Sequence, residues 1–194
     1  MYALPTILVL HGGGLKALTY MKLIIFVIGT LGIIYFSWWA SIKDRRYHGI
    51  YRFFAFESIL GLILVNLSYW FLNPFSLPQI VSWISLVFSL IVAIQGFYLL
   101  RVAGKPKEKF ENTTRLVEKG IYKYIRHPLY LSLILLGFGA YLKKITIFTS
   151  VLFLINLVAL LLTAKREEKE MIGSFGEEYI LYMKKTKIFV PFVF

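Results

Sequence analysis

The sequence predicts an all-α integral membrane protein, with five transmembrane helices packed as a bundle in a single membrane domain, residues 1–194. Composition supports this class, because 58% of the residues are hydrophobic and 18% are aromatic, more than a soluble domain usually carries. The mean hydropathy is +0.70. The apolar residues also come in blocks, most of them close to the roughly 20 residues that a helix needs to cross a bilayer.

The predicted spans follow one another with turns or charged loops between them. Lys143 and Lys144 turn the fourth span into the fifth, so that the last two form an antiparallel hairpin. The five spans are residues 21–41, 51–72, 80–100, 128–142 and 145–164.

An apolar segment, residues 2–10, comes before the first span. No basic residue precedes it, unlike the start of a signal peptide, and we interpret it as a peripheral or re-entrant segment. The glycines at 12–14 follow His11, and such a run can belong to a lipase oxyanion hole. That chemistry also needs a serine in a GxSxG motif, which the chain lacks. We therefore interpret residues 12–14 as a flexible turn.

The basic residues predict the orientation in the membrane. With five spans, eighteen of the 22 lysines and arginines fall on one side, in the first loop, the third loop and the carboxyl-terminal tail. Because positive loops stay in the cytoplasm, the amino terminus is expected outside and the carboxyl terminus in the cytoplasm. The net charge of +12 fits contact with anionic lipid headgroups. The charges lie beside spans instead of forming one soluble basic face, so we expect no nucleic-acid partner.

Other residue patterns narrow the function classes. The chain has no cysteine, which excludes disulfides, a thiolate metal site and a catalytic thiol, and we expect no metal. No glycine-rich dinucleotide fingerprint is present, which disfavours a nicotinamide-dependent reductase. Glu57 lies inside the second predicted span, where carboxyl groups are often functional, but a structural role near the helix end is favoured.

A polar cluster marks the start of the fourth span. Pro128 suits the first turn of a helix, and it disfavours helical geometry at His127. The free amides of a helix start bind anions, and Arg126 adds a full positive charge. The alternative is that Arg126 and His127 only anchor the span at the lipid headgroups.

Two carboxylates that could pair with this cluster follow the fifth predicted span. The sequence around Glu167 and Glu168 predicts a helix that continues beyond the membrane and stops at Gly173. Since the two spans of the hairpin are antiparallel neighbours, Glu167 is expected to face the corner formed by residues 126–128. A cationic and an anionic feature above an apolar floor suit a zwitterion that carries a flat apolar group.

The long third loop and the tail provide further candidates. Loops of more than twenty residues, such as 104–127, are usually functional, and the apolar Leu116 and Val117 within it are expected to line a slot. In the tail, apolar and aromatic residues fall on one helical face, which predicts a helix that lies at the membrane interface. This helix would act as a membrane anchor, as a lid over the site, or as both. That face carries Phe175, Tyr179, Tyr182 and Met183.

The ordered motifs resemble the isoprenylcysteine carboxyl methyltransferase family, which is related to membrane phospholipid N-methyltransferases. The resemblance covers residues 112–191 as a methyltransferase core. It implies a methyltransferase that uses S-adenosylmethionine, releases S-adenosylhomocysteine and encloses its cofactor with the last two spans and their cytoplasmic extensions. The motifs are Leu116-Val117, Gly120, Tyr122, Arg126-His127-Pro128-Leu129-Tyr130, Glu167-Glu168, Phe175-Gly176-Glu177-Glu178-Tyr179 and Tyr182.

The resemblance also implies roles for single residues. Glu167 would take the cofactor's ammonium group and the corner at His127 its carboxylate, with Arg126 and Glu168 as candidate catalytic residues. Tyr130 or Tyr122 would face the sulfonium, because an aromatic ring attracts a cation. The implied cofactor-binding residues are Arg115, Leu116, Val117, Tyr122, His127, Pro128, Leu129, Tyr130 and Glu167.

Two departures from the family bear on the methyl acceptor. Ser132 stands where many members have glycine, and Thr163 stands where eukaryotic members have an arginine that engages the substrate carboxylate. The expected acceptor is a lipophilic molecule that enters from the bilayer, with the carboxylate of a prenylcysteine-like substrate favoured because it needs no general base. The alternatives are N- or S-methylation of a phospholipid or small molecule, with Glu168 as a possible base, or a transporter or lipid-binding protein without chemistry.

Overall fold

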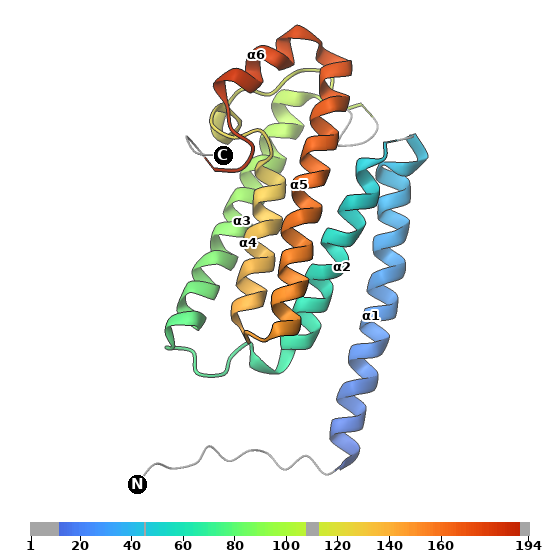
Figure 1. Ribbon diagram of the computed structural model, residues 1–194, viewed down its shortest axis with the longest axis vertical. Helices are drawn as coiled ribbons and strands as arrows, with labels where there is room; N and C mark the ends of the chain where they lie inside the picture. Colours follow the sequence, from blue (N-terminus) through green and yellow to red (C-terminus); the bar gives the residue numbers. More distant parts are fainter. Residues whose placement is uncertain (1–11, 45, 108–112, 191–194) are drawn as a thin grey trace.

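The computed structural model describes residues 12–44, 46–107 and 113–190, and their regular structure is helical. Apart from one isolated bridge between Ile125 and Lys187, these residues form no strand. The prediction of an all-α membrane bundle is confirmed (Figure 1). The helices are α1 (Gly12–Ala40), α2 (His48–Asn66), α3 (Leu77–Gly104), α4 (Pro128–Leu142), α5 (Ile147–Phe175) and α6 (Glu177–Lys185), with short 3₁₀ helices η1 (Ile42–Asp44), η2 (Leu67–Tyr69) and η3 (Gly120–Lys123).

Among the described residues, four helices are long and apolar enough to cross a membrane, namely those within Lys16–Ala40, His48–Tyr69, Leu77–Gly104 and Ile147–Phe175. The fourth predicted span, α4, has 15 residues. At 1.5 Å per residue it is about 22 Å long, shorter than the roughly 30 Å of a hydrocarbon core. The count of five spans therefore stays a prediction.

Two predicted helix boundaries are wrong. Helix α1 begins at Gly12, so residues 12–14 form a first helical turn, where glycine is tolerated, instead of a flexible turn. Helix α5 runs past Gly173 to Phe175, which confirms that it continues through Glu167 and Glu168. The helix ends at Gly176, whose φ of +59° is a conformation that favours glycine. Gly173 lies inside the helix, where a glycine costs only about 1 kcal/mol and does not end it. The segment at residues 2–10 lies outside the described residues.

Serine side chains join α3 to α4. Ser82, Ser85 and Ser89 donate hydrogen bonds of 2.6, 2.8 and 2.7 Å to the carbonyl oxygens of Gly139, Leu135 and Ser132. Small residues let two helices approach closely, and their hydroxyls then bond across the interface. This row of three bonds holds the short helix α4 beside α3 along much of its length (Figure 1).

A lysine closes the end of the bundle where α4 turns into α5. Lys143 is buried. Its Nζ donates a 3.0 Å hydrogen bond to Gln79 Oε1 and lies 3.8 Å from the centroid of the Trp83 ring. Burial lowers the pKa of Lys143. Lys144, its neighbour, is exposed. The turn predicted at these lysines is present, but one of the two cations packs against α3.

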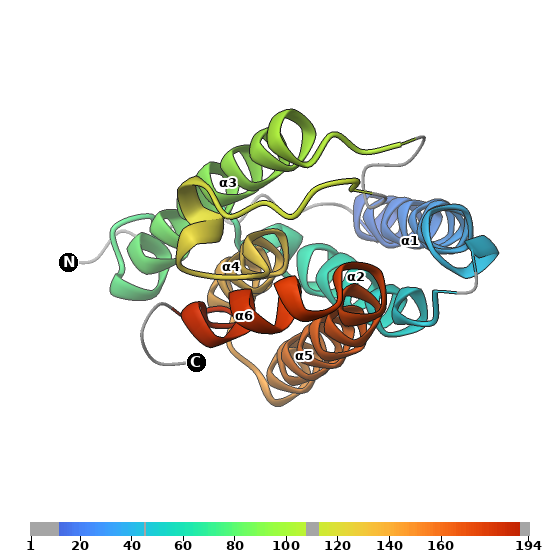
Figure 2. The same cartoon turned by 90° about the horizontal axis from the view of Figure 1, so that it is seen from above.

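The opposite end of the bundle carries the polar segments. Viewed along the bundle, α6 crosses above α4 and the end of α5 (Figure 2). The chain that follows α6 returns beside the start of α4, where the backbone N–H groups of Arg126 and His127 donate to the carbonyl oxygens of Lys187 and Ile188 at 2.8 and 3.2 Å. The third loop, α5, α6 and this returning segment thus meet at one place.

Candidate active site

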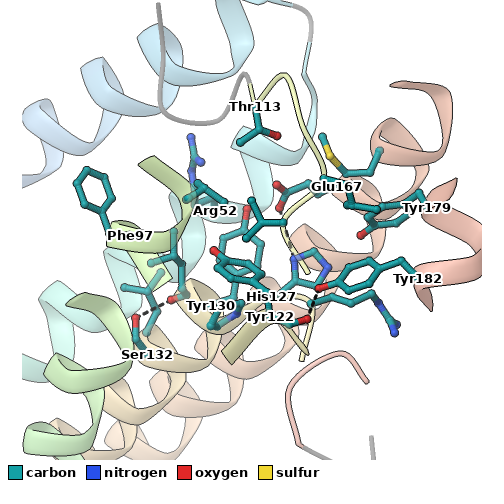
Figure 3. Close-up of a pocket in the computed structure, with 18 of the residues that line it drawn as sticks. Arg52, Phe97, Thr113, Tyr122, His127, Tyr130, Ser132, Glu167, Tyr179 and Tyr182 are labelled. Carbon is teal, nitrogen blue, oxygen red and sulfur yellow. Dashed lines mark hydrogen bonds and ion pairs between the residues drawn. The ribbon is translucent and has the colours of Figure 1, made fainter. Parts of the chain in front are cut away.

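A cavity of about 470 Å³ lies where α4 begins, lined by side chains from α1 to α6 and from the third loop (Figure 3). This volume falls in the range of small-molecule sites. Eight of the nine predicted cofactor-binding residues line it, whereas Arg115 is exposed and does not. The eight are Leu116, Val117, Tyr122, His127, Pro128, Leu129, Tyr130 and Glu167.

The corner at His127 has the geometry expected from the proline that follows it. His127 is non-helical, with φ −122° and ψ 60°, and α4 begins at Pro128. The buried His127 ring stacks on Tyr130, with centroids 5.4 Å apart and planes at 15°. The first-turn amides of such a helix have no acceptor within it, so this end of α4 favours negative charge.

The two carboxylates after the fifth span take different places. Glu167 lines the cavity, and its Oε2 lies 3.7 Å from His127 Nδ1. Glu168 does not line it, and its Oε1 accepts a 2.6 Å hydrogen bond from Arg126 Nε. The expectation that Glu167 faces the corner of residues 126–128 is confirmed.

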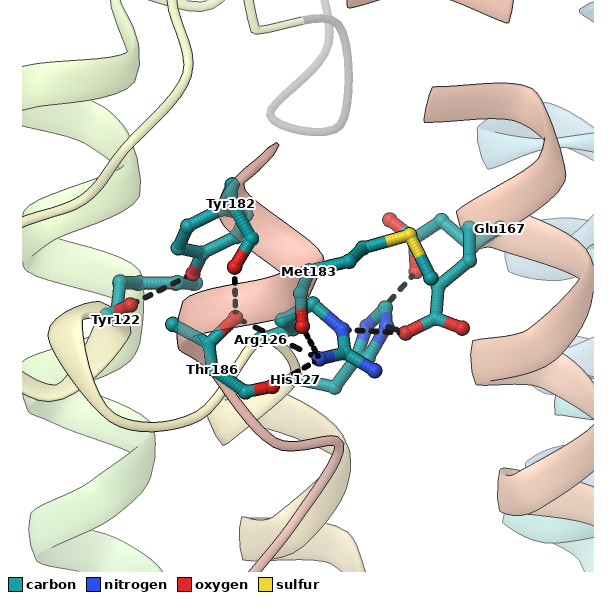
Figure 4. A network of polar contacts seen from close by, with 8 residues as sticks. Tyr122, Arg126, His127, Glu167, Tyr182, Met183 and Thr186 are labelled. Carbon is teal, nitrogen blue, oxygen red and sulfur yellow. Dashed lines mark hydrogen bonds and ion pairs between the residues drawn. The ribbon is translucent and has the colours of Figure 1, made fainter. Parts of the chain in front are cut away.

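Arg126, which also lines the cavity, connects three parts of the chain (Figure 4). Besides its ion pair with Glu168, its Nη1 donates to the carbonyl oxygens of Met183 and Thr186. Both partners of the ion pair are almost fully buried. Removing one partner of such a pair leaves a buried charge without compensation, so the pair fixes the loop, α5 and α6 relative to one another.

Tyrosines from the loop and from α6 cover the cavity. The Tyr182 hydroxyl donates a 2.7 Å hydrogen bond to the Tyr122 carbonyl oxygen, and Tyr179 packs edge-on against Tyr182. Burial raises the pKa of Tyr122, Tyr179 and Tyr182, with the charge of Glu167 adding to the rise at Tyr122 and Tyr179. These phenols therefore stay neutral and cannot act as bases. Tyr179 and Tyr182 face inward, as a lid over the cavity requires (Figure 3).

Sequence reasoning missed one wall of the cavity. Arg52 and Phe56 of α2, Phe36 of α1, and Phe97 and Leu100 of α3 line it. Arg52 was visible in the sequence only as one more basic residue near a span end. Because a helix of continuous hydrophobicity has no clear apolar face, the pattern could not tell which side of α2 faces the site.

Thr163, which stands where the resemblance to the eukaryotic isoprenylcysteine enzymes implies an arginine, does not line the cavity. It is fully buried, and its hydroxyl donates a 2.7 Å hydrogen bond to the Ala159 carbonyl oxygen one turn earlier. An arginine at this position would be buried within the bundle, so we do not expect Thr163→Arg to improve turnover.

Glu57 and possible metal ligands were also considered in the sequence. Glu57 accepts a 3.2 Å hydrogen bond from Thr30, which links α2 to α1 away from the cavity. Within the described ranges, no three histidine or acidic side chains gather as a metal site would require.

Residues 77–178, from the start of α3 into α6, match the family model described as phospholipid methyltransferase. The chain belongs to the phospholipid methyltransferase family. The match includes the serine-bearing helix α3 and therefore begins upstream of the core predicted at 112–191. It contains all eight cofactor-binding candidates that line the cavity. The resemblance drawn from the motifs is confirmed.

Curated proteins named as methyltransferases are similar to this chain over part of its length. Protein-S-isoprenylcysteine O-methyltransferase of Saccharomyces cerevisiae is 34% identical over 88 residues, which are 45% of this chain and 37% of that protein. Methanethiol S-methyltransferase of Crocosphaera subtropica is 27% identical over 140 residues, 71% of this chain and 50% of its own. The enzyme of the same name from Pseudomonas deceptionensis is 29% identical over 140 residues, which are 72% of this chain and 50% of that protein. The chain thus spans half or less of these curated relatives.

Proposed function

We propose that this protein is a membrane methyltransferase that uses S-adenosylmethionine and methylates a lipophilic acceptor at the cytoplasmic membrane interface. The observation that carries the proposal is the cavity in which the start of α4 with His127 and the carboxylate of Glu167 face each other beside aromatic walls. Family membership supports the same reaction class.

The residues that line the cavity fit the groups of this cofactor. Glu167, exposed by 21% and pointing into the cavity, suits the ammonium group, and the start of α4 at His127 and Pro128 suits the carboxylate. Leu116 and Val117 suit the flat adenine. Tyr130 and Tyr122 are the aromatic candidates for the sulfonium. When bound, the cofactor supplies an electrophilic methyl group on a positively charged sulfur.

The chain's own contribution is alignment and exclusion of water. Tyr179 and Tyr182 close the cavity from the α6 side, and the apolar wall from α1 to α3 gives the acceptor its place. Arg126 and Glu168 were expected to be catalytic, and we assign both to holding the corner. Glu168 does not line the cavity, and Arg126, which does, is engaged by Glu168 and by the carbonyl oxygens of Met183 and Thr186. A carboxylate acceptor needs no base, because an α-carboxyl with a pKa of about 3.5 is already ionised at neutral pH.

The favoured acceptor is the carboxylate of a prenylcysteine-like molecule that enters from the bilayer, and the alternatives are phospholipid or small-molecule N- and S-methylation. The isoprenylcysteine and methanethiol enzymes among the relatives favour these classes. A transporter or lipid-binding protein without chemistry is disfavoured because the charged and polar residues that line the cavity gather mainly around the start of α4. The charge distribution predicts that the carboxyl terminus lies in the cytoplasm. In this orientation the cofactor would reach the cavity from the cytoplasm.

Calorimetric titration of the purified protein with S-adenosylhomocysteine, beside NADPH, tests the proposal. We expect saturable binding of S-adenosylhomocysteine and none of NADPH. Binding of NADPH alone would instead favour a reductase, and binding of neither would refute the assigned cofactor site.

A further inference from the structure

A second cavity, of about 640 Å³, is lined by side chains of α1, α2 and α5. Helix α2 runs between the other two helices (Figure 1). Most of the lining is apolar, with Phe26 from α1, Phe54 from α2 and Leu152 from α5 among it. In the part of the chain that the structure describes, this cavity shares no lining residue with the cavity at His127. The two are therefore separate sites, and we call the second one the α2 groove.

Glu57 contributes a carboxyl group to the α2 groove. It is the tenth of the 19 residues of α2, about 14 Å from each end of the helix at 1.5 Å per residue. Glu57 thus lies in the middle of a membrane helix, and not near its end as the sequence suggested. Because the core of a bilayer contains no water, a polar group at this depth needs a partner from the protein or from a lipophilic molecule.

One of the two carboxyl oxygens of Glu57 has a partner in the protein. Its Oε2 accepts a 3.2 Å hydrogen bond from the Thr30 hydroxyl of α1. Its Oε1 is buried and has no hydrogen-bond partner among the described residues. The adjacent Ser58 does not supply one, because its hydroxyl donates a 2.8 Å hydrogen bond to the Ala55 carbonyl oxygen. Rotation about the last side-chain bond of a glutamate is soft, so the carboxyl group can turn the unpartnered oxygen toward the groove.

We propose that the α2 groove binds a lipophilic alcohol, whose hydroxyl donates a hydrogen bond to Glu57 and whose apolar chain lies against α1 and α5. A plain hydrocarbon chain would leave the carboxyl oxygen without a donor, which costs free energy where water is absent. A lipophilic cation is disfavoured because Lys22 lines the same groove, and because an isolated ammonium group is costly at the middle of a bilayer. A hydroxyl supplies the donor without a charge, and a carboxyl group accepts from it in both its ionised and its neutral form.

The binding of three oleyl compounds to the purified full chain tests this assignment. Oleyl alcohol donates a hydrogen bond, oleyl methyl ether does not, and oleylamine carries a positive charge. Native mass spectrometry in lauryldimethylamine oxide, a detergent chosen because it has no hydrogen-bond donor, measures the Kd of each. We expect the wild-type protein to bind the alcohol about three- to tenfold more tightly than the ether, as one hydrogen bond predicts.

Substitutions at Glu57 identify the group that receives this bond. Glu57→Leu removes the acceptor and should abolish the difference between alcohol and ether. Glu57→Gln keeps an acceptor oxygen without a charge and should retain the difference. Tighter binding of oleylamine than of the alcohol, with a loss of that preference in Glu57→Gln, would identify a cation as the occupant and overturn the assignment.

A substitution at Gly61 tests the place of binding. Gly61 lines the groove, and a Cβ there would lie 3.3 Å from Leu152 Cδ1, so Gly61→Leu should fill the groove and weaken binding of the alcohol at least tenfold. Gly32→Leu on α1 is the matched control, because a Cβ at Gly32 meets nothing within 4 Å and Gly32 does not line the groove. Its Kd for the alcohol should equal that of the wild type.

Thermal unfolding of each variant shows whether it folds, and the comparison of alcohol with ether on the wild-type protein needs no variant. Equal binding of these two compounds overturns the inference. Wild-type affinity for the alcohol in folded Gly61→Leu does so as well, because the alcohol would then bind elsewhere. None of these measurements involves S-adenosylhomocysteine, so failure of the proposed cofactor site would leave this test intact.

Discussion

Glu167 and Glu168 are consecutive residues on α5, yet only Glu167 lines the cavity, while Glu168 lies behind its wall in an ion pair with Arg126. Successive residues of a helix point about 100° apart, so two adjacent carboxylates separate into two environments. The side chain of Glu167 is 21% exposed and that of Glu168 is 9% exposed. The two residues should therefore respond differently to the same substitution.

Glu167→Gln should weaken S-adenosylhomocysteine binding about ten- to a hundredfold, because a charge-assisted hydrogen bond to an ammonium group contributes about 1.5–3 kcal/mol. Its thermal stability should stay near that of the wild type. Calorimetry and thermal unfolding in detergent measure the two quantities. Glu178→Gln, which removes the same charge from an exposed position on α6, is the control. A weakening as large in the control would mean that net charge, and not position 167, controls binding.

Glu168→Gln should instead lower stability. It leaves Arg126 buried without its partner, and breaking a buried ion pair costs about 3–5 kcal/mol. Arg126→Gln should have a similar effect. Because both variants remove the same interaction, the double variant should lose less than the sum of the two. Additive losses in thermal unfolding would contradict a direct role for this ion pair.

Gly139→Ala should destabilise the bundle, because α3 and α4 approach closely there. A Cβ at Gly139 would lie 2.7 Å from Leu86 Cγ and 3.1 Å from the Ser82 carbonyl oxygen. Gly32→Ala is the matched control, since a Cβ at Gly32 meets nothing within 4 Å. We expect the first variant to lower the unfolding temperature and the second to keep or raise it, as alanine favours the helix by about 1 kcal/mol over glycine. The reverse order would contradict the packing of α3 on α4.

The orientation can be tested with introduced cysteines, as the chain has none of its own. Lys143 is buried, so its exposed neighbour Lys144 is the better site at that end of the bundle, with Lys187 at the other. In sealed vesicles, Lys144→Cys and Lys187→Cys should react with an impermeant thiol reagent from opposite sides. Reaction of both from one side would mean that the ends of the bundle lie on the same side of the membrane.

Much of the fold follows from local pattern. The block lengths located the apolar helices, and Pro128 located the start of α4 at the residue where the structure has it. The hairpin geometry placed Glu167 opposite His127, because antiparallel neighbours joined by a short turn bring their far ends together.

Other features depend on contacts between distant segments. The inward rotation of α2 brings Arg52 into the cavity, and an all-round apolar helix gives no sequence signal for its rotation. Likewise, the partners of Arg126 include Met183, near the end of α6, and Thr186, directly after it, some sixty residues along the chain. The count of five spans stays a prediction, because the 15 residues of α4 are fewer than the roughly 20 that a full crossing needs.

The pairing of Arg126 and His127 with Lys187 and Ile188 has a consequence for how the protein is made. The membrane helices can insert one after another as the ribosome synthesises them, but the backbone partners of the His127 corner emerge only after α4, α5 and α6 have been made. A chain truncated before residue 187 would keep its apolar helices while lacking the segment that pairs with this corner. The corner at the start of α4 should therefore reach its final structure only after translation has passed Ile188.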